Sequence, residues 1–150
     1  MRLYVVVGPP AAGKSTWVRH RARPGDITID YDALAAALAP QSSPHQLPSH
    51  VAAITKAARQ AAIDTALRLA TECNVYVIHS TPGVARLAAY RKLGAVIVCV
   101  DPGEDIVTDR VTRERPWQMQ QVARKWYSDQ AAGLVPQPSK LPTSDASRTW

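Results

Sequence analysis

The chain has 150 residues, 46% of them hydrophobic, and a formal net charge of +6, which suits a single domain with one core. No apolar run approaches the length of a membrane span and the N-terminus lacks the features of a signal peptide, so we expect a cytoplasmic protein without membrane contact. Arginine carries most of the positive charge, which favours an anionic ligand or nucleic acid as partner; a solvated basic surface is the alternative.

The first expected element is a buried strand at Leu3–Val7, because this apolar run is continuous. The next residues, GPPAAGKST, have the G-x4-G-K-[ST] spacing of a P-loop, in which backbone N–H groups turn toward a phosphate. A helix should follow from Lys14 to about Ala22. The residues that we expect to bind the nucleotide here are Gly8, Ala11, Ala12, Gly13, Lys14, Ser15 and Thr16.

Lys14 and Ser15 have specific roles in the expected chemistry. The lysine ammonium should reach the β- and γ-phosphates of a nucleotide, and the Ser15 hydroxyl should be a ligand of Mg²⁺. No motif that specifies guanine stands out, so we expect ATP. The position of the motif between a strand and a helix argues against a chance match in a tight turn.

A second strand, Ile27–Ile29, ends in the polar residues Asp30, Tyr31 and Asp32, and an alanine-rich helix to about Ala39 should follow. We expect these three polar residues to contact the acceptor substrate. A carboxylate at this place can accept a proton from a hydroxyl group, and it can also cap the helix.

Residues 40–48 have the composition of a loop, with His45 and His50 at its edge. A metal site there lacks an acidic or cysteine partner nearby. A long helix should come next, because apolar or small residues recur at helical spacing and predict a buried stripe. The stripe consists of Val51, Ile54, Ala58, Ala61, Thr65 and Leu69.

The third strand, Val75–Ile78, ends in a polar segment in which Ser80 and Thr81 are expected to contact the acceptor. Beyond it we expect a helix over Val84–Leu93, a strand over Ala95–Val100, a helix opened by Glu104 and Asp105, a charged connection over Arg110–Pro116 and a last helix from Trp117 to about Ala132.

Strands that alternate with helices predict an α/β protein with a parallel sheet of four to five strands and helices on both faces, the three-layer P-loop NTPase fold. Residues 1–135 should form this domain, and 136–150, rich in Pro and Ser, a loosely held tail. The carboxyl ends of parallel strands meet at one edge, so the glycine loop and the polar residues after the second and third strands should form one site.

Four segments, GPPAAGKSTW, ITIDYDAL, VIHSTP and DPGEDIVTDRVTRERP, resemble the kinase domain of the bacteriophage-type 5′-hydroxyl polynucleotide kinases. They also resemble the small zeta-toxin-like and chloramphenicol-phosphotransferase-like kinases. The resemblance, over residues 3 to about 128, implies that Asp32, with Asp30 as the fallback, accepts the proton of the attacked hydroxyl. It further implies an arginine-rich lid in which Arg110 and Arg113, and also Arg115, neutralise the moving phosphoryl group; a solvated charged turn is the alternative.

Two positions depart from the polynucleotide kinases. Ala35 stands where those enzymes carry an arginine that contacts substrate phosphate, and His79-Ser80-Thr81 replaces an aspartate typical of the end of the third strand. A second carboxylate for Mg²⁺ is therefore missing there, and Asp101 after the fourth strand can be a turn former.

The expected function is that of an ATP- and Mg²⁺-dependent kinase. The acceptor would be a hydroxyl or phosphate of a nucleoside, a nucleotide or a nucleic-acid 5′ end. One alternative is a small-molecule kinase for an antibiotic or sugar, which Ala35 favours. The other is an ATP-binding module that only hydrolyses slowly.

Overall fold

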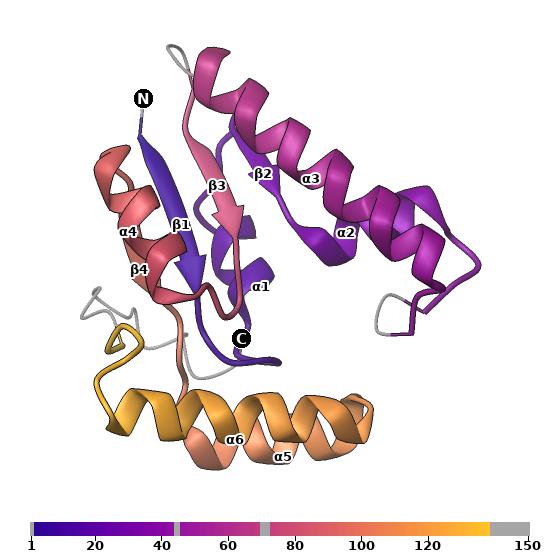
Figure 1. Ribbon diagram of the computed structural model, residues 1–150, viewed down its shortest axis with the longest axis vertical. Helices are drawn as coiled ribbons and strands as arrows, with labels where there is room; N and C mark the ends of the chain where they lie inside the picture. Colours follow the sequence, from indigo (N-terminus) through magenta and orange to yellow (C-terminus); the bar gives the residue numbers. More distant parts are fainter. Residues whose placement is uncertain (1, 44–45, 70–72, 139–150) are drawn as a thin grey trace.

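The computed structural model describes residues 2–43, 46–69 and 73–138 (Figure 1). His45 and most of the segment expected as a tail lie outside the described residues. The strands are β1 (Leu3–Val7), β2 (Ile27–Ile29), β3 (Val75–Ile78) and β4 (Val96–Cys99). The helices are α1 (Lys14–Arg19), α2 (Tyr31–Leu38), α3 (Ser49–Leu69), α4 (Val84–Lys92), α5 (Glu104–Glu114) and α6 (Trp117–Ala131).

The described strands form one parallel sheet in the order β2-β3-β1-β4. Val5 in the central strand β1 pairs with Val77 of β3 on one side and with Ile97 of β4 on the other. Helices connect each strand to the next, as parallel pairing requires. The predicted α/β architecture of a P-loop protein is confirmed, with four strands in the described part of the chain.

Helices cover both faces of the sheet, because alternate residues of a strand point to opposite sides. Val5 and Val7 of β1 face a core that includes Ile63 of α3 and Trp126 of α6. Val6, between them, faces the other side and belongs to a cluster with Trp17 of α1. The continuous apolar run of β1 is therefore buried on both faces.

The long helix α3 is rotated relative to the predicted stripe. Ile54 is 55% exposed, whereas Thr55 is fully buried and Ile63 and Ala66 pack in the core. The hydroxyl of Thr55 donates a hydrogen bond of 2.8 Å to the carbonyl oxygen of Val51. The hydroxyl therefore keeps a hydrogen-bond partner although the side chain is buried. No helix among the described residues, α3 included, is long and apolar enough to cross a membrane.

Helices α5 and α6 form a pair across the carboxyl ends of the strands (Figure 1). Val107 and Val111 of α5 are buried with Ala123 of α6 and with Ala12 of the P-loop. The predicted connection from Arg110 was wrong, because the buried valines lie one turn apart and α5 continues to Glu114. The pair thus packs directly against the glycine loop.

Asp101, which follows β4, fixes the position of α6. Its Oδ1 accepts hydrogen bonds from the Tyr127 hydroxyl at 2.8 Å and from the Gly103 N–H at 2.9 Å. Its Oδ2 accepts one from Gln130 at 3.3 Å. Burial and the bond to Asp101 raise the pKa of the Tyr127 phenol, which therefore remains a donor at neutral pH.

Candidate active site

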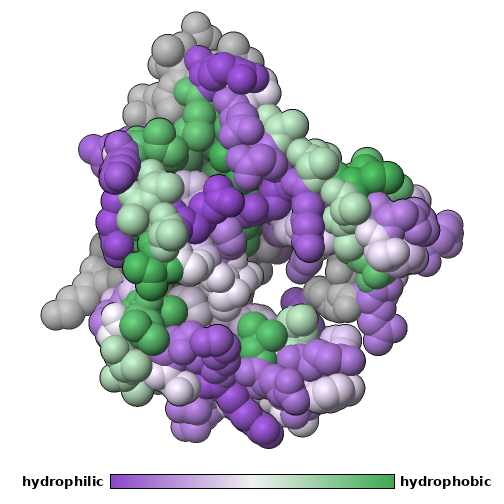
Figure 2. Space-filling model, in the orientation of Figure 1, coloured by the Kyte–Doolittle hydropathy of each residue, from purple (hydrophilic) through white to green (hydrophobic). Residues whose placement is uncertain are grey.

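A cavity of about 1070 Å³ opens at the carboxyl ends of the strands. Figure 2 shows it as a hollow between the α5–α6 pair and the side of the molecule formed by α2 and α3. The residues predicted for the site that line it are Ala11, Ala12, Gly13, Lys14, Ser15, Thr16, Asp30, Tyr31, Asp32, Ser80, Thr81 and Arg110. Two predicted residues, Gly8 and Arg113, do not line it.

Gly8 fixes the start of the P-loop against the sheet. Its φ angle is +148°, and a Cβ atom at this position would lie 2.1 Å from the carbonyl oxygen of Val100. Its own N–H donates to the carbonyl oxygen of Ser80 at 3.0 Å. Further along, Ala11 and Gly13 have positive φ angles of 57° and 90°. Where left-handed residues follow right-handed ones, successive backbone N–H groups point to the same side and form a concave nest that can bind an anion.

Lys14 lies at the base of the cavity and is 7% exposed. Its ammonium donates to the carbonyl oxygens of Pro9 at 2.6 Å and Gly8 at 3.1 Å. Desolvation lowers the pKa of this amine from 10.5 to about 8, although the nearby carboxylates of Asp30 and Asp32 oppose the shift. A buried cation of this kind gains from an anionic ligand, because the ligand supplies the opposite charge.

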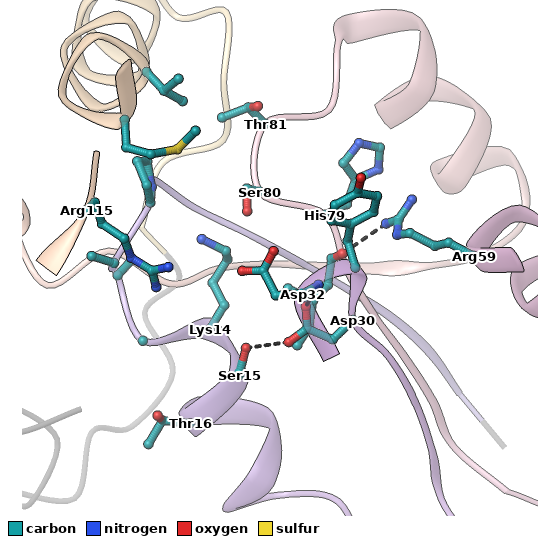
Figure 3. Close-up of a pocket in the computed structure, with 18 of the residues that line it drawn as sticks. Lys14, Ser15, Thr16, Asp30, Asp32, Arg59, His79, Ser80, Thr81 and Arg115 are labelled. Atoms are coloured by element: carbon teal, nitrogen blue, oxygen red, sulfur yellow. Dashed lines mark hydrogen bonds between the residues drawn. The ribbon is translucent and has the colours of Figure 1, made fainter. Parts of the chain in front are cut away.

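Asp30 connects the end of β2 to the P-loop. Its Oδ2 accepts a hydrogen bond of 2.6 Å from the Ser15 hydroxyl, and its Oδ1 caps α2 by accepting the N–H of Asp32 at 3.1 Å (Figure 3). Mg²⁺ prefers oxygen ligands and commonly uses one or two protein groups together with phosphates. Ser15 and Asp30 fit such an ion, and the described residues contain no cluster of three or more His, Cys, Asp or Glu that could form a closed metal cage.

Asp32 lies between the P-loop and the segment after β3. In Figure 3 its carboxylate points toward Lys14 and Ser80, whereas Asp30 points toward Ser15. Tyr31, Ser80 and Thr81 line the same cavity. The structure therefore brings together the polar residues that the sequence placed after β2 and β3.

The three arginines of the expected lid lie in different places. Arg110 donates from Nη1 to the carbonyl oxygen of Ala11 at 3.3 Å and so contacts the P-loop. Arg115, at the end of α5, points into the cavity on the side of Lys14 (Figure 3), and its charge helps to lower the lysine pKa. Arg113 pairs with Asp109 and its side chain is 67% exposed, because it lies on the face of α5 opposite to Val111.

Sequence reasoning missed the contribution of α3 to the cavity. Lys56, Arg59 and Gln60 of this helix line it, together with His79 after β3. Arg59 donates to the carbonyl oxygen of Ile78 at 2.9 Å. Burial, with the charges of Arg59 and Arg86, lowers the pKa of His79 to about 4, so this imidazole is neutral at pH 7.

A sequence profile of the AAA domain family matches residues 3–125. The chain belongs to this family of P-loop, kinase-like domains. The resemblance to small P-loop kinases noted in the sequence is thereby confirmed. A search of curated proteins finds no match.

One solved structure has a similar fold. The chain is similar to a chain of the Pnkp1/Rnl/Hen1 RNA repair complex, with 15% identity and a TM-score of 0.63 over 96% of this chain and 50% of that one. It thus spans half the length of that relative. It is also similar to the tunicamycin resistance protein of Deinococcus radiodurans, with 17% identity and a TM-score of 0.49 over 92% and 99% of the two chains.

Proposed function

We propose that the protein is an ATP-dependent kinase that transfers the γ-phosphoryl group of ATP to a hydroxyl or phosphate of a nucleoside, a nucleotide or a nucleic-acid 5′ end. The observation that carries this proposal is that Lys14, the Ser15–Asp30 pair and Asp32 line one cavity. Beyond the phosphate loop, the polar side chains of Tyr31, Ser80 and Thr81 line the same cavity and offer contacts to a second substrate. The size of the cavity supports a site for two substrates.

The roles follow from the positions of the side chains. The P-loop N–H groups and Lys14 hold the β- and γ-phosphates, and Ser15, with Asp30 behind it, would hold Mg²⁺, which would neutralise charge on the phosphates. Asp32 accepts the proton of the acceptor hydroxyl as the new oxygen–phosphorus bond forms and ADP leaves. Arg115, with Arg110 on the P-loop, stabilises the charge that develops on the transferred group.

The test is an acceptor screen with labelled ATP, run on the protein and on two matched variants. Asp32→Asn should abolish transfer while leaving ATP binding intact. Asp64→Asn, on the exposed side of α3 outside the cavity, should leave both unchanged. Undiminished transfer by Asp32→Asn would remove the proposed base, and ATP binding without transfer to any acceptor would favour a binding module.

A second candidate function is that of a small-molecule kinase. Ala35 is fully buried. Because it is an alanine, α2 presents no cation at the position where polynucleotide kinases carry an arginine. The same screen, extended to sugars and antibiotics, separates this candidate from the first.

A further inference from the structure

One face of α3 forms a wall of the cavity, on the side opposite to α5 and α6. Ala52, Lys56, Arg59 and Gln60 all line the cavity, and their spacing places them on one side of a helix. In Figure 3 Arg59 enters from the α3 side, whereas Lys14 and Arg115 lie on the far side of Asp32. The cavity therefore has a P-loop half and an α3 half, with the two aspartates between them.

The charged side chains of the two halves differ in the charged groups that surround them. The described cavity lining contains the cations Lys14, Lys56, Arg59, Arg110 and Arg115 and the carboxylates Asp30, Asp32 and Glu114. Three of these cations, Lys14, Arg110 and Arg115, lie in the P-loop half, where a triphosphate would bind. Within the described part of the chain, neither Lys56 nor Arg59 forms an ion pair with a carboxylate.

Arg59 is held in place although it lacks an anionic partner in the described residues. Its Nη2 donates to the carbonyl oxygen of Ile78, and its Nε is buried without a hydrogen-bond partner. The neighbouring His79 is neutral at pH 7, and an imidazole carries no negative charge in either form, so it supplies no counter-charge to the guanidinium. Keeping a half-buried guanidinium without a counter-charge costs free energy, which an anionic ligand would recover.

We propose that Lys56 and Arg59 form an anion subsite that binds a phosphate group of the acceptor, whose hydroxyl group faces Asp32. The acceptor class is then a phosphorylated hydroxyl compound, such as a nucleoside 3′-phosphate or a 5′-hydroxyl oligonucleotide, rather than a neutral nucleoside, sugar or antibiotic. Both examples carry a phosphate ester a few bonds from a hydroxyl group. The inference rests on the proposed kinase function and names its substrate class.

The kinetic test compares three acceptors: adenosine, adenosine 3′-phosphate and a short 5′-hydroxyl oligonucleotide. Wild-type protein should phosphorylate the two phosphorylated acceptors with kcat/KM at least about tenfold higher than adenosine, as expected for charge-assisted hydrogen bonds. Lys56→Gln should lower these two values about tenfold, and Arg59→Lys by a similar factor, because lysine lacks the planar fork of arginine. The ratio of kcat/KM for adenosine 3′-phosphate to kcat/KM for adenosine should therefore fall in both variants, and the KM for ATP should not rise.

Arg68→Gln is the matched control, since Arg68 is an exposed cation of α3 outside the cavity. It should leave all the kinetic values unchanged. Equal kcat/KM for adenosine and its 3′-phosphate in the wild type would overturn the subsite. So would a higher KM for ATP in Lys56→Gln, because these cations would then serve the nucleotide. Lys56 is exposed and has no hydrogen bond to lose among the described residues, so this variant remains informative if Arg59→Lys is unstable.

A binding measurement separates failure of the subsite from failure of the kinase function. Calorimetry with ADP and Mg²⁺ present should show adenosine 3′-phosphate binding about tenfold more tightly than adenosine, and Lys56→Gln should remove the difference. If the protein phosphorylates none of the three acceptors yet shows this preference, the kinase proposal fails and the subsite stands. If both compounds bind equally, the subsite fails whatever the kinase assay shows. A preference for oligonucleotide over mononucleotide identifies a nucleic-acid end as the source of the phosphate.

Discussion

The Ser15 hydroxyl donates a hydrogen bond of 2.6 Å to Oδ2 of Asp30. This bond joins the P-loop to the end of β2, and the other oxygen of Asp30 accepts the N–H of Asp32. Both carboxylate oxygens of Asp30 are thus engaged in holding the site together. We therefore assign Asp30 the support of Ser15 and of a metal ion there, and we propose proton transfer for Asp32, whose carboxylate points toward Lys14 and Ser80 (Figure 3).

Substitution of the two aspartates should give different outcomes. Asp30→Ala removes the cap of α2 and the bond to Ser15, so we expect a loss of about 1 kcal/mol in the free energy of unfolding. Asp32→Asn keeps the size of the side chain and one acceptor oxygen, so it should cost less stability than Asp30→Ala yet lower kcat by on the order of 10²–10⁴. Denaturant titration and kinase assays on both variants check this. A marked loss of stability in Asp32→Asn, with transfer retained, would reverse the assignment.

Gly8 should tolerate no side chain. In Gly8→Ala the Cβ would lie 2.1 Å from the carbonyl oxygen of Val100, so the P-loop or the chain after β4 must move, at a cost of about 3 kcal/mol. Gly25→Ala is the matched control, because Gly25 also has a positive φ angle (+92°) but nothing within 4 Å of its Cβ position. We expect a cost of about 1–2 kcal/mol there. Equal costs in denaturant titrations of the two variants would contradict the close approach.

The strands and the P-loop could be predicted from the sequence because their signals are local. The apolar runs LYVVV and VYVI gave the bounds of β1 and β3 correctly, since strands buried on both faces need no alternation. Because the carboxyl ends of parallel strands meet at one edge of the sheet, the sequence also predicted that Asp30, Asp32 and Ser80 lie close together.

The rotation of α3 could not be predicted in the same way. Alanine occurs all round this helix, so the contrast between its faces is weak, and a buried threonine, Thr55, replaces the expected Ile54. Thr55 is acceptable in the core only because its hydroxyl bonds to the preceding turn. Because Lys56 and Arg59 lie on the face that the rotation turns toward the cavity, their place in the site depended on information that the sequence pattern did not contain.

The lid arginines should differ in their effect on catalysis. Arg115→Ala should lower kcat by about 10³, because Arg115 points into the cavity beside Lys14 and arginines in this role stabilise transferred charge. Arg113→Ala should change kcat less than about twofold, because the side chain pairs with Asp109 on the exposed face of α5 and surface pairs of this kind contribute little. Single-turnover kinetics on the two variants measure the difference. A large loss in Arg113→Ala alone would mean that α5 turns when substrate binds.

Nucleotide binding should be coupled to proton uptake by Lys14. Its pKa is lowered to about 8, so at about pH 9 most molecules carry a neutral amine, whereas at about pH 7 most carry the ammonium ion. Phosphate oxygens stabilise the charged form and raise this pKa in the complex. Calorimetry with ATP and Mg²⁺ in buffers of different ionisation enthalpy should therefore show uptake of nearly one proton at about pH 9 and of almost none at about pH 7. Affinity should fall as pH rises through about 8, and Lys14→Met should lose both the uptake and most of the affinity. Uptake that persists in Lys14→Met would show that another group titrates, and equal uptake at the two pH values in the wild type would show that the pKa of Lys14 is not lowered in the free protein.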